Sequence, residues 1–280
     1  MSKQQAFLGK AIVLYLLVVL IGALTALPFV WMLSTSFKLP TEAVTVPPEW
    51  IPDPFTWENY TALFTSSFLS FPRFIFNSVK IAVLVVVGRL LICSLGGYGF
   101  ARLEFPGRDA AFALLLASLM IPGMVMVFPL YFAYAKIGWI DTHWPLIIPP
   151  IVANTFGTFL LRQFFMTIPK DLEDAAVVDG ASHLWIFWRI MLPLSGPVLA
   201  TLAIFTFMGS WNDFFDPLIY LNRTDNFTLT VGLAFFNDSA AAQYTRLMAG
   251  VVISLIPMLA VYSFAQKYFT RGITLTGIRG

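Results

Sequence analysis

The residues best suited to binding a polar solute follow one another at Trp211, Asn212 and Asp213, and Asp216 comes three residues later. A sugar presents apolar C–H faces and many hydroxyl groups, so a tryptophan beside an amide and a carboxylate suits it. An ionisable residue inside a membrane helix is costly and normally faces a cavity or a partner. The alternative is a helix end at the lipid headgroups, with Trp211 as an interfacial anchor.

A second polar group lies in the segment 168–193, between two apolar stretches. Pro169 suits the start of a short helix, and the acidic residues after it complement the positive end of the helix macrodipole. These acidic residues are Asp171, Glu173 and Asp174. Gly180 is well suited to end this helix. Two readings follow, a rigid protrusion that passes force to a soluble partner, or an ordinary amphipathic connector.

A second short helix is expected between Gly180 and Pro193, because four apolar residues share the spacing of one helix face. They are Leu184, Phe187, Trp188 and Met191. Pro193 then interrupts the chain before the next apolar stretch.

The sequence offers little for catalysis or metal binding. No G-x-x-x-x-G-K-[ST] run is present, so the chain has no phosphate-binding loop of the Walker type. His143 and His183 are isolated from each other and from any serine–carboxylate arrangement. The single cysteine, Cys93, lies in an apolar run and is expected to be a small buried hydrophobe. We therefore expect no catalytic site, no metal and no cofactor.

Composition indicates that lipid surrounds most of the chain. The 280 residues are 58% hydrophobic and only 11% charged, whereas soluble domains are about 25% charged. The net charge of +2 and the scattered basic residues give no indication of nucleic-acid binding.

Six stretches are long and apolar enough to cross a bilayer, which predicts an all-α, polytopic membrane protein with a single transmembrane domain over 1–280. The expected helices are about 11–33, 74–101, 110–135, 142–161, 190–222 and 247–266. The first stretch is longer than the core of a signal peptide and is expected to be retained. A proline- and tryptophan-containing loop, 34–73, follows it on the outer side.

The distribution of lysine and arginine predicts the orientation. With the N-terminus in the cytoplasm, the greater share of the basic residues in the connecting segments falls on the inner side. Both termini, the loop 168–193 and the tail 267–280 are then cytoplasmic. Lys80 and Arg89 lie within the second helix, and the sequence assigns Arg89 no partner.

The loop 168–193 resembles the "EAA" loop of binding-protein-dependent ABC importer permeases, whose pattern is E-A-A-x-x-D-G-A followed by L-P-x-x-x-P. The matching elements are Glu173-Asp174-Ala175-Ala176, Asp179-Gly180-Ala181, Leu192-Pro193 and Pro197. Asp174 departs from the pattern, since the family usually has alanine there. This substitution makes the loop more acidic without changing its spacing.

Two further segments resemble the same family. The segment 98–108 is similar to "AYAFARxxFxGR" in the carbohydrate branch. The end of the chain, 271–280, is similar to the tail of the second permease subunit of maltose- and glycerol-phosphate-type importers. The resemblance covers nearly the whole chain and implies a type I ABC importer permease fold.

The resemblance implies roles for named residues. The loop is expected to be a coupling helix in a cleft of a cytoplasmic ATPase subunit, with Glu173 as the motif glutamate and Gly180 as the motif glycine. Its contact residues would be Glu173, Asp174, Ala175, Ala176, Asp179 and Gly180. In the tail, Gly277, Arg279 and Gly280 are expected to touch the ATPase subunits. The carbohydrate branch often shows "WN" and an acidic residue at Trp211, Asn212 and Asp213, which supports a sugar-type solute.

The expected assembly contains a second permease subunit as a heterodimer, two ATPase subunits and an external solute-binding protein, embedded in lipid. A homodimer is the alternative. The expected location is the plasma membrane of a bacterium or archaeon, and ATP hydrolysis is expected on a separate chain. Three other functions stay open: a permease for glycerol-phosphate or another non-sugar solute, a secondary transporter, and a membrane-embedded enzyme. An enzyme would need a cluster of acidic residues or histidines at one membrane face, where the sequence offers only Asp213 and Asp216.

Overall fold

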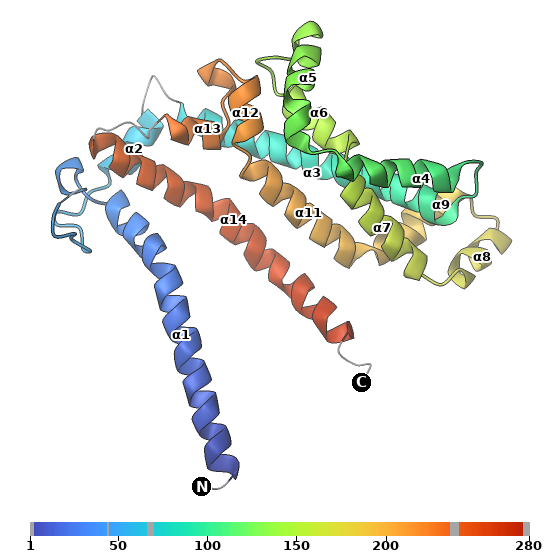
Figure 1. Cartoon of the computed structure of the whole chain (residues 1–280), viewed down its shortest axis with the longest axis horizontal. Helices are drawn as coiled ribbons and strands as arrows, with labels where there is room; N and C mark the ends of the chain where they lie inside the picture. Colours follow the sequence, from blue (N-terminus) through green and yellow to red (C-terminus); the bar gives the residue numbers. More distant parts are fainter. Residues whose placement is uncertain (1–2, 44, 66–69, 236–240, 277–280) are drawn as a thin grey trace. The chain divides into compact units, whose positions relative to one another are not determined.

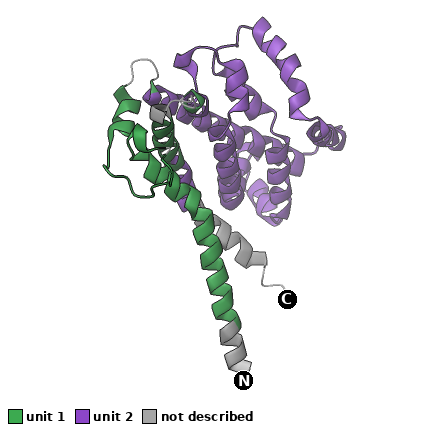
Figure 2. Cartoon of the chain, turned by 60° about the vertical axis from the view of Figure 1, so that its left-hand side comes forward, with its two compact units in different colours: residues 1–70, 233–256 green, residues 71–232, 257–280 purple. Residues whose placement is uncertain are grey.

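A computed structural model describes residues 3–43, 45–65, 70–235 and 241–276. Every regular element in these ranges is a helix (Figure 1), which confirms the predicted all-α fold. Four of the described helices are long and apolar enough to cross a membrane, or six spans if each of two bent helix pairs counts as one. The chain forms two compact units (Figure 2), residues 1–70 with 233–256 and residues 71–232 with 257–280.

The first unit contains α1 (Lys3–Ser36), α2 (Glu58–Thr65) and the first part of α14 (Ala241–Thr276). The side chains of α1 from Ile12 to Val30 are apolar and mostly exposed. A helix that is apolar all round is normally covered by lipid or by other protein.

Polar contacts order the segment that follows α1. The amide of Asn59 donates hydrogen bonds to the carbonyl oxygens of Ser36 (2.9 Å) and Lys38 (2.8 Å). The ammonium of Lys38 is fully buried and lies 4.1 Å from the centre of the Trp31 ring. The aromatic rings of Phe37, Phe55, Trp57 and Tyr60 pack together beside it.

The second unit is organised around α3 (Phe71–Arg102), which contacts α6 (Trp144–Val152), α7 (Thr155–Thr167) and α11 (Gly196–Trp211) (Figure 1). Close packing of α3 on α7 requires glycine at position 97. A Cβ atom there would lie 2.9 Å from the backbone nitrogen of Arg162. Cys93 is buried near this contact, as expected.

Two of the long apolar stretches are broken by bends. The stretch 110–135 forms α4 (Arg108–Ala117), a short 3-10 turn (Ser118–Met120) and α5 (Gly123–Lys136), and the two arms are bent by 98°. The break lies at Ile121, which is extended because it precedes Pro122. The α6–α7 pair forms one span, Trp144–Thr167, which continues past residue 161.

The stretch 190–222 is also interrupted. Residues 190–191 end a π-helical turn (Phe187–Met191), and the chain continues through α10 (Leu192–Leu194) and bends by 77° into α11. That helix ends at Trp211, and the chain resumes as α12 (Phe215–Tyr220). Residue 217 is proline and has no N–H to donate to the carbonyl oxygen of Asp213. The hydroxyl of Thr230 donates to that oxygen instead, at 2.6 Å. The chain then passes through a 3-10 turn (Thr224–Asn226) into α13 (Leu229–Ala234).

Candidate functional site

The loop 168–193 forms two short helices at one end of the second unit. The first, α8 (Asp171–Val178), has Asp171, Glu173 and Asp174 in its first turn. The turn that follows α8 contains Gly180, whose φ of +83° is the left-handed conformation that favours glycine. The backbone N–H of Ala181 closes this end with a hydrogen bond to the carbonyl of Ala176, at 2.9 Å.

The second short helix is α9 (His183–Ile186), which continues into a π-helical turn (Phe187–Met191). The hydroxyl of Ser182 caps α9 by accepting a hydrogen bond from the N–H of Trp185, at 3.3 Å. Of the predicted apolar face, Phe187 and Met191 are buried, whereas Leu184 and Trp188 are exposed. A π-helical turn holds one residue more than an α-helical turn, so the regular spacing of the face is lost.

An apolar cluster anchors this loop to the long helices. Ala176 from α8 and the buried residues of the second short helix pack with residues of α3, α7 and α11. The cluster members are Cys93, Tyr98, Leu161, Phe165, Ile168, Ala176, Ile186, Phe187, Met191, Val198 and Leu202. The loop therefore packs rigidly on the helices behind it.

A buried ion pair strengthens this anchor. The guanidinium Nε of Arg102, the last residue of α3, lies 2.7 Å from the carboxylate of Glu173, and the two side chains are 5% and 13% exposed. Arg102 also donates to the carbonyl oxygens of Phe165 (2.7 Å) and Ile168. Burial raises the pKa of Glu173 above its ordinary value of 4.5, although Arg102 opposes the shift. The motif glutamate thus points into the chain.

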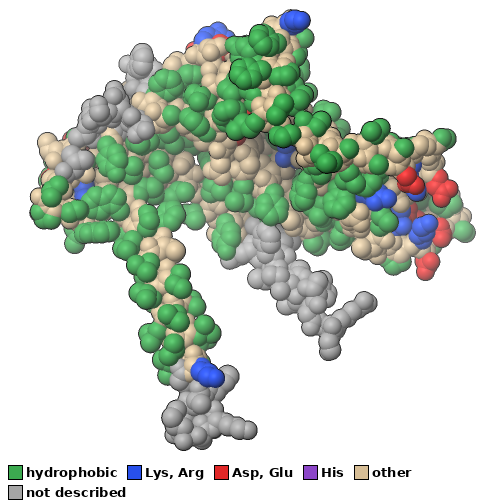
Figure 3. Space-filling model, viewed as in Figure 1, with side chains coloured by type: hydrophobic (Ala, Val, Ile, Leu, Met, Phe, Trp, Pro, Cys, Tyr) green, Lys and Arg blue, Asp and Glu red, His purple; other side chains and the backbone are tan. Residues whose placement is uncertain are grey.

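The rest of the motif faces outward. Asp174, Ala175, Asp179 and Gly180 are exposed, whereas Ala176 is buried. A hollow of about 750 Å³ lies among the loop's own residues, including Leu172, Asp179 and Trp185. Large apolar side chains are exposed around it, among them Val178, Leu184 and Trp185. Acidic side chains gather at this end of the unit (Figure 3). Of these apolar residues the sequence indicated only Leu184. Sequence reasoning missed the exposure of Val178 and Trp185, and it missed the partner of Glu173, although Arg102 lies in the family-like segment 98–108.

Trp211, Asn212 and Asp213 do not converge on one site. Trp211 is buried and its ring stacks on that of Phe207, with centroids 5.7 Å apart. Asn212 is exposed and its amide donates to the carbonyl of Met208, at 3.0 Å. Asp213 lines a separate cavity of about 220 Å³ with Asp216 and Arg89.

Arg89 has a partner that the sequence did not reveal. Its Nε donates a hydrogen bond to the carbonyl oxygen of Pro150, at 2.8 Å. That carbonyl belongs to α6, where Pro149 and Pro150 interrupt the helical hydrogen-bond ladder. Over the residues that the structure describes, no three His, Cys, Asp or Glu side chains are grouped to hold a metal ion. The predicted tail contacts Gly277, Arg279 and Gly280 lie outside the described residues.

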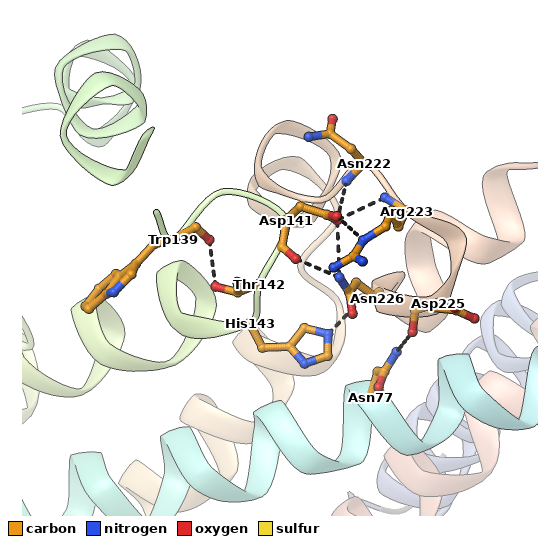
Figure 4. A network of polar contacts seen from close by, with 9 residues as sticks. All are labelled: Asn77, Trp139, Asp141, Thr142, His143, Asn222, Arg223, Asp225 and Asn226. Carbon is orange, nitrogen blue, oxygen red and sulfur yellow. Dashed lines mark hydrogen bonds and ion pairs between the residues drawn. The ribbon is translucent and has the colours of Figure 1, made fainter. Parts of the chain in front are cut away.

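A polar network that sequence reasoning missed joins the segments 137–143 and 221–226 (Figure 4). Asp141 has a φ of +60° and accepts hydrogen bonds from the backbone N–H groups of Asn222 (3.0 Å) and Arg223 (2.9 Å). The guanidinium of Arg223 and the amide of Asn226 also contact it. Burial raises the pKa of Asp141, but these hydrogen bonds outweigh it and lower the pKa to about 2. The sequence signal was weak because the partners lie about eighty residues apart.

Comparisons with known proteins agree with the architecture. The family described as "Binding-protein-dependent transport system inner membrane component" matches residues 93–275. The arabinooligosaccharides transport system permease protein AraQ of Halalkalibacterium halodurans is 37% identical, over 93% of each chain. The sn-glycerol-3-phosphate transport system permease protein UgpE of Yersinia enterocolitica is 34% identical, over 83% of this chain and 85% of its own.

A solved structure shares the fold. It is a bacterial ABC transporter involved in the import of the acidic polysaccharide alginate, and one of its chains superposes with a TM-score of 0.85. The superposition covers 96% of this chain and 99% of that chain, at 23% sequence identity. The match over residues 93–275 and the relatives that share more than a third of their sequence show that this chain belongs to the family of inner membrane components of binding-protein-dependent transport systems.

Proposed function

We propose that this chain is the permease subunit of an ATP-driven importer, that it forms half of the pathway for a carbohydrate, and that its loop 168–193 couples it to a cytoplasmic ATPase. The observation that carries the proposal is the loop itself, which exposes an apolar hollow and is tied to α3 by the Arg102–Glu173 ion pair.

The two faces of the loop suit two tasks. Large apolar side chains around a hollow that faces water are typical of a protein-docking surface. Asp174, Ala175, Asp179 and Gly180 lie on that exposed side. Glu173 and Ala176 lie on the inner side, against the long helices. A partner that moves the loop would therefore move the inner end of α3 with it.

The sequence supports ATP hydrolysis on a separate chain, because it contains no phosphate-binding loop of the Walker type. The family description, a component of a binding-protein-dependent system, supports an external solute-binding protein as partner. A second permease subunit and two ATPase subunits complete the proposed assembly. In the tail, Gly277, Arg279 and Gly280 are proposed to contact the ATPase subunits.

The proposed location is a bacterial or archaeal plasma membrane, with both termini and the loop 168–193 in the cytoplasm. The excess of lysine and arginine in the segments assigned to the inner side supports this orientation. The family description names an inner membrane component, which agrees with a multi-pass plasma-membrane protein.

The substrate class rests on the relatives. The names of two of them specify arabinooligosaccharides and galactooligosaccharides, so a carbohydrate is the first candidate. The relative named for sn-glycerol-3-phosphate makes that ester the second candidate. Asp213 is the best placed of the three predicted pathway residues, because it alone lines a polar cavity. Trp211 and Asn212 do not line this cavity and are proposed to contribute to the pathway outside it.

A charge-exchange experiment tests the coupling role. The complete transporter is reconstituted with Arg102→Glu, with Glu173→Arg, and with both substitutions together. Each single variant leaves a buried charge without its partner, a change that typically costs about 3–5 kcal/mol. Binding-protein-stimulated ATPase activity and uptake should therefore fall about tenfold or more in each single variant, and the double variant should recover part of the loss.

Asp109→Arg is the matched control, because the Asp109 side chain is 81% exposed and its contact with Arg108 is at the surface. This control should retain normal uptake. If both single variants of the buried pair also import at the wild-type rate, the loop has no coupling role through Arg102.

A further inference from the structure

We propose that the 220 Å³ cavity of the second unit is a binding site, within this chain alone, for the hydroxyl groups of one sugar residue of the solute. It lies among α3, α6, α11 and α12, and its polar wall includes Arg89, Thr206, Ser210, Asp213, Asp216 and Thr228, with Ser78 beside them. The inference rests on the proposed function, because it takes the solute to be a carbohydrate.

The charged side chains of the cavity form no ion pair with one another, although Asp213 accepts a hydrogen bond from the backbone N–H of Asp216, at 3.4 Å. The ion pairs among the described residues do not include Arg89, Asp213 or Asp216. Arg89 uses its Nε on the carbonyl of Pro150, so its two terminal nitrogens are available to the cavity. Charged groups in an apolar helix bundle require polar partners, since an unsatisfied buried charge is very costly. The carboxylate of Asp216 and the terminal nitrogens of Arg89 lack such partners among the described residues, so a polar occupant would satisfy them.

The hydroxyl of Thr206 is a second, independent indication of an occupant. The residue is 2% exposed, and its oxygen has no hydrogen-bond partner within the described ranges of the chain. Other hydroxyls of this region bond to the carbonyl four residues earlier, as Thr201 does to Pro197 at 3.0 Å and Ser195 to Met191 at 2.7 Å. Thr206 makes no such bond and lines the cavity.

The mixture of groups selects the class of ligand. Two carboxylates would repel a phosphate or a uronate, and the guanidinium would repel a cation. A hydroxyl group both donates and accepts, so it can donate to Asp213 or Asp216 and accept from Arg89 or Thr206. A neutral, hydroxyl-rich ligand is the class that satisfies all of these groups together.

The volume limits the size of the ligand. A cavity of about 220 Å³ has room for about seven water molecules at about 30 Å³ each. This space suits one small ring and is too small to enclose an oligosaccharide as a whole. A longer carbohydrate would therefore occupy the cavity one residue at a time.

The first test removes only the unpaired hydroxyl. Thr206→Val keeps the shape of the side chain, and Thr201→Val on the same helix is the matched control, because its hydroxyl is already bonded within the helix. The complete transporter, with its binding protein, is assayed for uptake of arabinooligosaccharides or galactooligosaccharides. Thr206→Val should raise the KM about fivefold, as expected for one lost hydrogen bond, while Thr201→Val leaves the KM unchanged. The melting temperature of Thr206→Val should not fall, because no bond within the chain is lost.

The second test measures occupancy directly. Cys93, the chain's single cysteine, is replaced by serine, and Ser210→Cys is introduced into the cavity wall. Labelling of Ser210→Cys by methyl methanethiosulfonate should slow in the presence of the transported oligosaccharide. Labelling of Phe205→Cys, an exposed position of the same helix, should not change.

The outcomes separate this inference from the proposed function. Normal carbohydrate uptake with an unchanged KM in Thr206→Val and no protection of Ser210→Cys would show a cavity filled only by water and would overturn the inference. A transporter that imports glycerol 3-phosphate instead, with protection of Ser210→Cys by that ester, would overturn both the carbohydrate assignment and the neutral-ligand argument.

Discussion

At the scale of single residues, Glu173 shows how burial changes the role of a carboxylate in a sequence motif. A solvent-exposed glutamate would be ionised at any physiological pH and free to pair with a partner protein. In this chain the carboxylate is enclosed with Arg102, and burial raises its pKa. The proposed link between loop and helix therefore depends on the ionised state of one buried group.

This dependence predicts a pH effect. As the pH falls towards the raised pKa of Glu173, the carboxylate gains a proton and its attraction to Arg102 weakens. Binding-protein-stimulated ATPase activity should decline at a higher pH than an ordinary carboxyl, with a pKa of 4.5, would allow. Glu173→Gln should lack this acidic limb. Stability should change in the opposite direction. Because folding raises the pKa of Glu173, the folded protein holds this proton more tightly than the unfolded chain does. The contribution of Glu173 to the free energy of unfolding is therefore lost as the pH rises through the raised pKa. An identical acidic limb in both proteins would contradict the assignment.

Gly180 supports a second prediction at this scale. Its φ of +83° is strained for any residue with a Cβ atom, although nothing lies within 4 Å of the position a Cβ would take. Gly180→Ala should therefore cost about 1–2 kcal/mol through the backbone alone and lower the stimulated ATPase activity. Gly99→Ala is the control, because Gly99 is helical and equally unobstructed. Gly99→Ala should be neutral or stabilising, and equal losses in both variants would show that the turn has no special role.

At the scale of elements, the Asp141 network holds two segments of the second unit together. Asp141→Asn keeps a residue type that tolerates a positive φ, but it removes the charge that Arg223 and two backbone N–H groups contact. The variant should lose about 1–3 kcal/mol of stability, measured as a lower melting temperature in detergent. Because the pKa of Asp141 is about 2, its stabilisation should be complete above its ordinary pKa of 3.8 and be lost as the pH falls from there towards 2.

Asp225→Asn is the comparison for this prediction. Its ion pair with Arg73 is exposed on both sides, and such pairs contribute little to stability. A fall in melting temperature as large as that of Asp141→Asn would indicate a general charge effect and not a specific network.

The elements also show how far the sequence could predict the fold. Hydropathy located the apolar stretches, because a possible membrane span is recognised from the length and composition of the segment alone. The breaks within these stretches depend on particular residues and on their contacts with other helices, which hydropathy does not report. Pro217 lies in the first turn of α12 and cannot donate to the carbonyl oxygen of Asp213, and the hydroxyl of Thr230 donates to that oxygen instead. That pairing joins residues on different elements, and no local pattern reveals it.

The candidate site was predictable in part for the same reason. The helix stop at Gly180 follows from local backbone preferences. The Arg102–Glu173 pair and the cavity around Asp213 arise from tertiary contacts between distant segments. Trp211 and Asn212 were grouped with Asp213 by adjacency, but α11 ends at Trp211 and the chain changes direction before α12 begins at Phe215.

At the scale of the whole molecule, the exposed apolar surface calls for further protein or lipid. Between Ile12 and Val30 the exposed side chains of α1 are nearly all apolar, and the hollow of the loop 168–193 faces outward. One chain with up to six spans would supply half of the proposed pathway.

The complex purified in mild detergent should therefore contain one copy of this chain, a second permease chain and two ATPase chains, as measured by native mass spectrometry. Two copies of this chain would establish a homodimer, and a transport-competent single chain would refute the assembly.

The contacts of Arg102 have a consequence for biogenesis. A nascent chain is synthesised from its N-terminus, so α3 and its terminal arginine are made long before Phe165, Ile168 and Glu173 exist to receive it. Until then the guanidinium has none of these partners and must stay at the aqueous side of the bilayer, where water and lipid phosphates can solvate it. Arg102 can therefore become buried only when the loop 168–193 packs against the end of α3. A chain truncated before Glu173 would lack this closure and should be a preferred target of membrane quality-control proteases.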